Sequence, residues 1–169
     1  MSYFNWVRTI AADHVSTPLN FAWVRCWTSG VLSHGTEAFT TPIEDYLASA
    51  LARHLATTNR MYNDLSSVAR DTAECNLNSV HFLEFNKTPS PDVAAQKSGL
   101  RSLAEYEHEC VEDTLGRLER KMARSKPHMQ NGTTVGNMKL APIKLLCDVS
   151  HLWDQLYMVR DHSSTMQSQ

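Results

Sequence analysis

The chain has 169 residues, of which 42% are hydrophobic and 20% charged, a composition typical of one globular domain. Its formal net charge of -2 argues against a general nucleic-acid or membrane-surface binder, because such proteins are usually basic. No apolar run is long enough to cross a bilayer, no secretory signal opens the chain, and the four cysteines form no Cys-x-x-Cys pair. We therefore expect a cytoplasmic protein with reduced thiols.

The predicted elements are all helical. Gly and Pro, six of each, cluster between segments with helical periodicity, and few segments alternate with period two. Pro18 is expected to break or kink the backbone between the first two helices, and the second should stop at Ser29-Gly30. The pattern predicts an all-α helical bundle with helices at about residues 3–12, 19–28, 42–74, 96–124 and 138–159, and loops at 76–91 and 126–137.

The central helix has the clearest start. Thr41 is placed to cap it, Pro42 suits its first position, and Glu44 completes a capping box. No Gly or Pro follows until Pro89, so this helix is expected to run on to about residue 74. In the last two helices we expect these residues to be buried: Leu100, Leu103, Val111, Leu115, Leu118 and Met122, then Leu145, Leu146, Val149, Leu152, Trp153 and Leu156.

Three residues with oxygen-bearing side chains recur every fourth position of the central helix. Asn63, Ser67 and Asp71 drift by only about 80° over roughly 12 Å of one helix face. Mg²⁺ prefers oxygen ligands and often completes its shell with substrate phosphates, which would add the negative charge that one carboxylate lacks. On the same face lie Arg60, Arg70 and Glu74, and on the opposite face Met61, Leu65, Val68 and Thr72. The competing interpretation is a solvated polar face without a ligand.

The pattern Asn63-Asp64-x-x-Ser67-x-x-Arg70-Asp71 resembles the second metal motif of class I terpene cyclases, N-D-x-x-S-x-x-(K/R)-(E/D). The wider stretch 60–85, with Asn76-Leu77-Asn78-Ser79-Val80, looks like the C-terminal cyclase domain of fungal bifunctional diterpene synthases of the ent-kaurene type. Residues 6–21 resemble the broken helix that precedes this motif. The resemblance implies the C-terminal part of the class I terpenoid synthase fold.

The same resemblance implies roles for individual residues. Asn63, Ser67 and Asp71 would be magnesium ligands, and Asp71 stands where the family more often has Glu. Arg70 would contact diphosphate, and Arg160 is the best match to a second diphosphate-binding arginine, although the expected Arg-Tyr pair is absent. Arg8 is a weaker candidate for the same role. The substrate implied is an allylic prenyl diphosphate, most consistent with diterpene formation.

The sequence also departs from the family. Class I cyclases need an aspartate-rich D-D-x-x-D motif on a facing helix, and this sequence has none. We therefore interpret residues 1–169 as a single partial cyclase domain whose aspartate-rich half is absent, with the missing N-terminal half of the cyclase as its partner. The alternative is a non-catalytic helical interaction module or a truncated pseudoenzyme, because a half-bundle would expose apolar surface.

Two further patterns have simpler interpretations. Glu105-x-x-His108, near Glu109 and Glu112, matches one half of a di-iron motif, but a second copy is missing, so a charged solvent face is favoured. The first 27 residues are rich in aromatic side chains, which we expect to belong mainly to the core, with one or two in a pocket: Tyr3, Phe4, Trp6, Phe21, Trp23 and Trp27.

Overall fold

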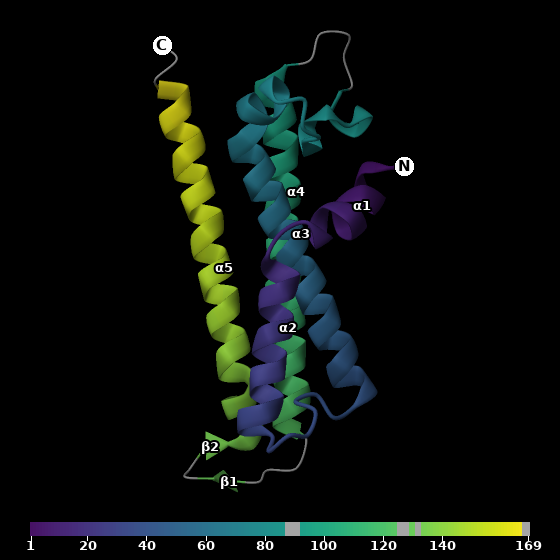
Figure 1. Ribbon diagram of the computed structural model, residues 1–169, viewed down its shortest axis with the longest axis vertical. Helices are drawn as coiled ribbons and strands as arrows, with labels where there is room; N and C mark the ends of the chain where they lie inside the picture. The colour runs from purple at the N-terminus through teal and green to yellow at the C-terminus, as the bar shows by residue number, and fades with distance from the viewer. Residues whose placement is uncertain (87–91, 125–128, 131–132, 167–169) are drawn as a thin grey trace.

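The architecture is all-α, as predicted, and centres on two long antiparallel helices, α3 and α4 (Figure 1). The computed structural model describes residues 1–86, 92–124, 129–130 and 133–166. In chain order the elements are α1 (Tyr3–Trp6), a π-helical turn (Val7–Ala11), α2 (Thr17–Trp27), a π-helical turn (Thr28–Leu32), α3 (Pro42–Ala73), two 3-10 turns (Ser79–His81 and Leu83–Phe85), α4 (Val93–Arg124), the two-residue strands β1 (Met129–Gln130) and β2 (Thr133–Thr134), which pair antiparallel, and α5 (Val135–Met166).

Helix α3 starts and ends as the sequence predicts. The Thr41 hydroxyl accepts a hydrogen bond from the Glu44 amide at 3.2 Å, and the Glu44 carboxylate accepts one from the Thr41 amide at 3.1 Å. At the other end, Cys75 adopts a left-handed φ of 57°. The Asn76 amide then donates to the Asp71 carbonyl at 2.8 Å, a Schellman closure that turns the chain back along the helix.

Other predicted boundaries are wrong by several residues. The helical backbone is interrupted at residues 14–16, between the first two helices, as expected, but Pro18 lies just after this break, within the first turn of α2, where its missing N–H costs no hydrogen bond. A π-helical turn carries the helical backbone past Ser29-Gly30, where we expected a stop. Helix α4 begins three residues early, and α5 extends beyond both of its predicted ends. Element boundaries depend on tertiary contacts as well as on local propensity.

Two apolar clusters hold the helices together. The first joins α2, the N-terminal half of α3, the C-terminal half of α4 and the start of α5; it includes Leu51, Leu118 and Ile143. The second joins α1, the C-terminal half of α3 and the start of α4; it includes Tyr3 and Leu65. The apolar side predicted for α4 is confirmed, since its members are buried or packed against these clusters.

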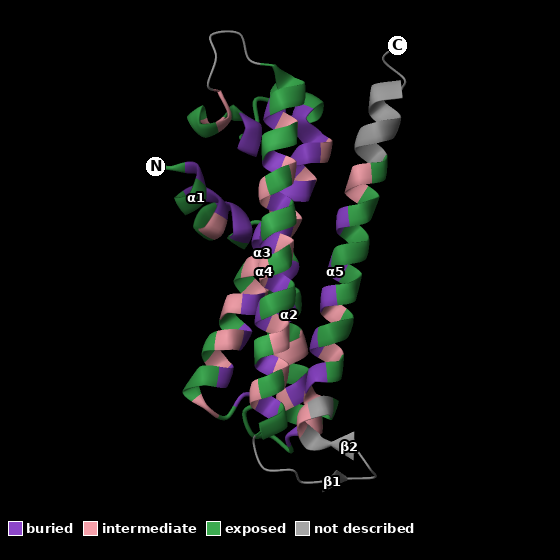
Figure 2. Cartoon of the chain, turned by 180° about the vertical axis from the view of Figure 1, so that it is seen from behind, coloured by how far each residue is buried: buried purple, intermediate pink, exposed green. Residues whose placement is uncertain are grey.

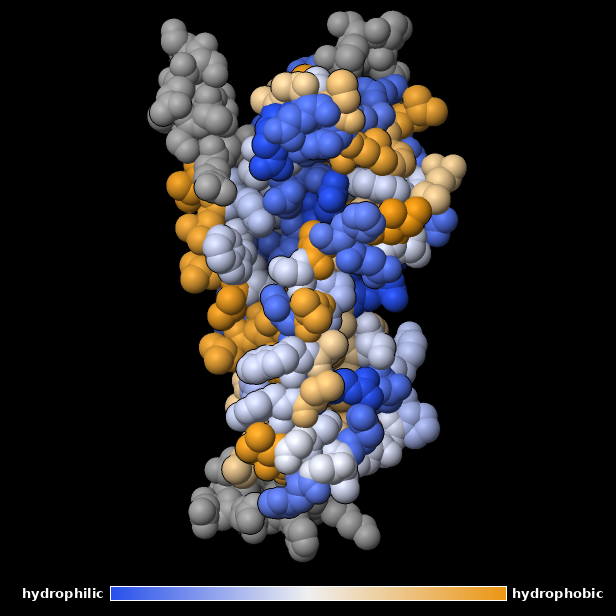
Figure 3. Space-filling view, in the orientation of Figure 1, coloured by the Kyte–Doolittle hydropathy of each residue, from blue (hydrophilic) through white to orange (hydrophobic). Residues whose placement is uncertain are grey.

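The buried face predicted for α5 is wrong. Leu145 is 63% exposed, Leu152 is 59% exposed, and only Leu146 of the predicted set packs partly against the core. Seen from behind, most of α5 is exposed (Figure 2). In the orientation of Figure 1, hydrophobic side chains gather along it (Figure 3). The helix is buried instead along one narrow stripe: Leu140, Ile143, Cys147, Ser150 and Asp154. Within the described part of the chain, no helix is both long and apolar enough to span a membrane.

Candidate metal centre

The motif lies on an unbroken stretch of α3 near its C-terminal end. Ser67 and Asp71 are 4% and 5% exposed, and Asn63 is half-buried. A solvated polar face is therefore the wrong interpretation for Ser67 and Asp71. Thr72, which we expected on the apolar side, is exposed in the last turn of α3.

A buried asparagine beyond the helix organises these side chains. The Schellman turn brings Asn78 back against α3, where it is fully buried. Its Nδ2 donates to Asp71 Oδ2 at 2.8 Å and to the Asp64 carbonyl at 2.8 Å. Ser67 Oγ donates to the same Asp71 Oδ2 at 2.6 Å. Two donors therefore hold one carboxylate oxygen in place.

These contacts keep Asp71 ionised. Burial by itself raises the pKa of a carboxyl group, but hydrogen bonds from Ser67, Asn78 and Arg70 to Asp71 outweigh it and hold its pKa below the usual value. The Arg70 guanidinium lies 3.3 Å from Asp71 Oδ1. Asp71 is thus negatively charged at neutral pH, as a carboxylate that binds a metal cation must be.

A second buried aspartate of the motif, Asp64, has a structural role. Asp64 is fully buried, pairs with Arg60 at 2.9 Å, and accepts from the amide and hydroxyl of Ser79 at 2.9 and 2.6 Å. Burial raises the pKa of Asp64, although Arg60 and Ser79 oppose that effect. The Arg60 guanidinium also lies 5.2 Å from the centroid of the Trp6 ring. Asp64 therefore ties α3, α1 and the 3-10 turn together.

Asn63 and Asp71 both face a polar cavity of about 380 Å³. Ser67 does not line it and lies behind Asp71. While donating its proton to Asp71, the Ser67 hydroxyl keeps acceptor lone pairs. The cavity is lined by Trp6, Ile10, Ala11, His14, Arg60, Asn63, Arg70, Asp71, Asn76 and Leu77. The amide oxygen of Asn63 and the carboxylate of Asp71 at the cavity wall, with the Ser67 hydroxyl behind Asp71, are oxygen ligands of the kind that fit Mg²⁺.

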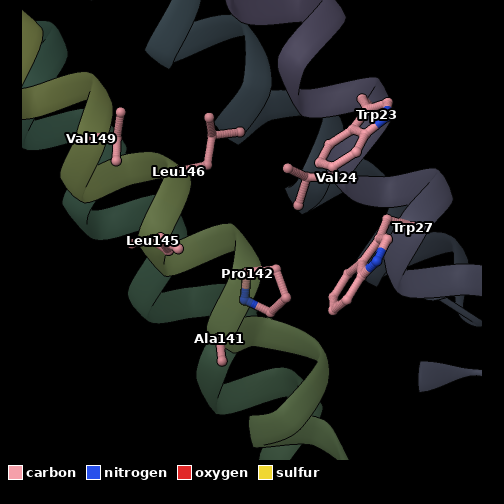
Figure 4. Close-up of a pocket in the computed structure, with 8 residues that line it drawn as sticks. All are labelled: Trp23, Val24, Trp27, Ala141, Pro142, Leu145, Leu146 and Val149. Carbon is pink, nitrogen blue, oxygen red and sulfur yellow. The ribbon is translucent and has the colours of Figure 1, made fainter. Parts of the chain in front are cut away.

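A larger cavity of about 570 Å³ lies beside the first and reaches α5. The two share His14, Arg60 and Asn63, so Asn63 stands at their junction. On the α5 side, its wall includes Leu146 and Val149. These two residues also line a third, apolar cavity of about 580 Å³ between α2 and α5 (Figure 4). A polar region at the motif thus leads into an apolar groove.

The predicted arginines have different positions. Arg70 is exposed and lines the polar cavity beside Asp71. Arg8 donates to the buried Glu107 at 3.0 Å and lines neither cavity at the motif, which argues against a role at diphosphate. Arg160 falls within α5, but its side chain lies outside the described residues.

Sequence reasoning did not assign roles to Asn78 or Asp64. Asn78 stands in the segment Asn76-Leu77-Asn78-Ser79-Val80, which we noted only for its resemblance to fungal synthases. Its contact with Asp71 depends on the turn at Cys75, where no glycine marks a left-handed backbone. The aromatic cluster is divided: Tyr3, Trp6 and Phe21 are buried, whereas Trp23 and Trp27 are exposed in the apolar groove.

Along almost its whole length, the sequence is similar to fungal diterpene synthases. It is 41% identical over 167 residues to the ent-kaur-16-ene synthase of Phaeosphaeria sp. (strain L487), and 38% identical over 167 residues to that of Fusarium fujikuroi. It is 37% identical over 158 residues to the pimaradiene synthase of Emericella nidulans, covering 92% of this chain and 15% of the relative. The first two alignments cover 98% of this chain but 17% of each relative's length. No protein-family profile and no solved structure matches the chain.

Proposed function

We propose that this chain, a homologue of one segment of the fungal diterpene synthases, forms the part of a diterpene cyclase site that carries the second magnesium motif. Its substrate is an allylic prenyl diphosphate, which is ionised and then cyclised. Asn63, Ser67 and Asp71 hold Mg²⁺, and Arg70 and Arg160 contact the diphosphate.

One observation carries this proposal: the motif lies where a polar cavity leads into an apolar groove. Asn63 borders both polar cavities, and Leu146 and Val149 border both the larger polar cavity and the groove. A prenyl diphosphate has the same division into a charged head and an apolar chain. The order of polar and apolar walls therefore matches the order of groups in the substrate.

The charge balance of the site favours binding of metal and diphosphate together. Asp71 supplies the only carboxylate among the three proposed ligands, and two donors already hold its Oδ2. One negative charge holds Mg²⁺ weakly, and diphosphate oxygens would add the charge that is missing. When bound, Mg²⁺ neutralises charge that develops on the leaving diphosphate. Arg70, exposed at the cavity wall, adds a positive charge for the same group.

The apolar groove would hold the hydrocarbon chain. Its walls come from α2 and α5, and the rings of Trp23 and Trp27 point toward α5 across it (Figure 4). Aromatic faces attract cations, so these two indoles are suited to stabilise a carbocation. Both indoles are exposed, at 68% and 41%. Cyclisation needs a closed cavity that excludes water, so another part of the protein must cover this groove.

The partner that would cover the groove is the half of the cyclase that carries the aspartate-rich motif. This sequence has no D-D-x-x-D pattern, and its relatives are several times longer. Ionisation in this class needs metal on both sides of the diphosphate, and α3 supplies one side. We expect catalysis only when the aspartate-rich half is present, on the same chain or as a second one.

The exposed apolar face also favours a second candidate function, a helical interaction module without catalysis. Large apolar patches on a surface mark contact sites for other proteins. The two functions differ at α3: a pure interaction module needs no ion at Asp71, whereas a cyclase site does. Binding of magnesium together with pyrophosphate therefore separates them.

The direct test is calorimetric titration of the purified chain with Mg²⁺, in the presence and in the absence of inorganic pyrophosphate. We expect weak binding of Mg²⁺ alone and clearly tighter binding with pyrophosphate. Asp71→Ala should weaken the pyrophosphate-dependent binding at least about tenfold, equivalent to about 1.4 kcal/mol, because it removes the only charged ligand.

The matched control is Asp113→Ala, which removes an exposed aspartate from α4 that pairs with Arg117 on the surface. This variant should bind as the unaltered chain does. If Asp71→Ala binds Mg²⁺ and pyrophosphate with unchanged affinity, the metal site is not at Asp71. If the unaltered chain shows no pyrophosphate-dependent binding, the interaction module is the better interpretation.

A further inference from the structure

A second group of potential metal ligands lies between α4 and α5, and the proposed cyclase chemistry does not use it. His108 comes from α4, and His151 and Asp154 come from α5, three residues apart on one helix face. Their ligand atoms all lie within 4.8 Å of one another. The two imidazole rings are 4.5 Å apart between centroids. This arrangement brings two nitrogen ligands and one carboxylate to one point.

Asp154 is the independent sign that this point receives a ligand. Its side chain is almost fully buried, at 2% exposure, and its Oδ1 has no hydrogen-bond partner within the described residues. It borders a cavity of about 230 Å³ that His108 and His151 also line. Burying a carboxylate without a partner is costly, and such groups are normally paired or bound to a metal.

The protonation state of His108 suits metal binding, and Asp154 would give up its proton to a bound cation. Burial and the neighbouring His151 lower the pKa of His108, so its imidazole is neutral at pH 7 and has a free lone pair. Burial raises the pKa of Asp154 to about 8 when no cation is near. A divalent cation beside this group would favour its ionised form.

A nearby cluster shows what a satisfied buried carboxylate looks like. His54, Glu107 and Cys110 also lie close together. There, however, Glu107 already accepts from Arg8 and lies 2.6 Å from His54 Nδ1, so both of its oxygens have partners. That cluster fastens the N-terminal segment to α3 and α4. Of these two clusters among the described residues, the one at Asp154 combines ligand geometry with an unpartnered acceptor.

We propose that His108, His151 and Asp154 form a zinc site that fastens α5 to α4. Zinc takes histidine nitrogen and carboxylate oxygen at about 2.0–2.2 Å in a tetrahedral arrangement. Ligand atoms in such a site lie roughly 3.4 Å apart, so rotations of these side chains can close the present spacing. Glu112, whose Oε1 lies 3.6 Å from His108 Nε2, is placed to complete the shell directly or through water.

The position of His108 differs from the purely charged solvent face that we expected there. Glu105, Glu109 and Glu112 are exposed as expected, but His108 is half-buried and faces α5. A di-iron site would need a second Glu-x-x-His motif, which the sequence lacks. The actual neighbours are His151 and Asp154 on α5, more than forty positions away.

The site has a structural consequence. Helix α5 is buried along a narrow stripe whose last buried member among the described residues is Asp154; beyond it Tyr157 and Met158 are only partly buried, and the other sides of the helix are largely exposed. A zinc ion at this point would fix the position of α5 against α4. It would thereby stabilise the wall of the apolar groove that Leu146 and Val149 form.

The experiment is zinc titration of the purified chain after removal of metals with a chelator. Zinc affinity is measured by competition with a chromophoric chelator, and Co²⁺ is used as a spectroscopic substitute that absorbs visible light strongly in tetrahedral sites. The variants are His151→Ala, which removes an exposed side chain and should fold, and Asp154→Asn, which keeps the shape of the carboxyl group. His34→Asn is the control, because Asn tolerates the positive φ of 50° at that position.

We expect one zinc ion per chain, a tetrahedral Co²⁺ spectrum without thiolate bands, and a melting temperature that zinc raises. His151→Ala and Asp154→Asn should each lower the zinc affinity at least tenfold and abolish the rise in melting temperature, whereas His34→Asn should leave both unchanged. Zinc binding that His151→Ala does not weaken would overturn the proposal. So would a chain that binds no zinc at one equivalent, or a Co²⁺ spectrum dominated by cysteine.

Discussion

Two buried aspartates, Asp71 on α3 and Asp154 on α5, differ in their hydrogen-bond partners and therefore in their pKa values. Asp71, at the end of α3, receives hydrogen bonds from Ser67, Asn78 and Arg70, and its pKa is held below the usual value. Asp154, on α5, is as deeply buried, but its Oδ1 lacks a partner within the described residues, and burial raises its pKa to about 8. Burial alone therefore does not decide the charge of a carboxyl group; the donors around it do.

The difference follows from how each helix is packed. Helix α3 is covered by α1, α4 and the returning chain after Cys75, which brings Asn78 to the motif. Helix α5 meets the rest of the structure along one stripe and leaves its apolar side open. The α3 side thus supplies its own donors, whereas on the α5 side the described residues provide no donor to Asp154 Oδ1 and leave one apolar face exposed.

The largest expected effect is on the pH dependence of stability at Asp154. A carboxyl group whose pKa is raised in the folded state stabilises the fold at low pH, and this contribution is lost as pH rises toward the folded value of about 8. In the presence of a chelator, the free energy of unfolding should therefore fall by about 4 kcal/mol between pH 5 and pH 8.5, and Asp154→Asn should remove most of that fall. Urea denaturation at both pH values measures it. If the free energy of unfolding changes with pH in the same way for the variant and the unaltered chain, Asp154 does not have a raised pKa in the folded state.

An opposite sign is expected at Asp71. Because the folded-state pKa of Asp71 is lowered, its ionised form stabilises the fold above the ordinary pKa, and that contribution is lost as pH falls through the folded value. Asp71→Asn should lower the free energy of unfolding by about 2 kcal/mol at pH 7 in magnesium-free buffer, which is the usual contribution of hydrogen bonds to a charged group.

The control for this prediction is the exposed Asp113, where Asp113→Asn should change the free energy of unfolding by less than about 0.5 kcal/mol. Both values come from urea denaturation under the same conditions. Should Asp71→Asn prove as mild as the control, the network around Asn78 contributes nothing to the stability of this chain.

The smallest effect is expected on the open side of α5. Leu152 is 59% exposed, so Leu152→Ser should change the free energy of unfolding by less than about 0.5 kcal/mol. Ile143 on the same helix is fully buried, and Ile143→Ala should cost about 2–5 kcal/mol. Thermal or urea unfolding of the two variants measures both changes in the free energy of unfolding. A large loss at Leu152 would show that this face is covered in the isolated chain.

The sequence determined those features that depend on neighbouring residues. Thr41, Pro42 and Glu44 specify the start of α3 within four positions, and the capping box forms as predicted. The apolar spacing in α4 correctly marks its buried side. The spacing of Asn63, Ser67 and Asp71 likewise requires only a continuous helix, which the structure confirms.

Tertiary structure alone decided the rest, because those features depend on which segment lies opposite. The six positions that we expected to be buried in α5 are apolar in any context, but burial depends on a covering partner, which the described chain supplies, in part, to Leu146 alone. The contact of Asn78 with Asp71 depends on a left-handed backbone at Cys75, a position where the sequence has no glycine to indicate such a turn. His108 meets His151 and Asp154 only because α4 and α5 pack side by side, a relation that no local pattern in the sequence records.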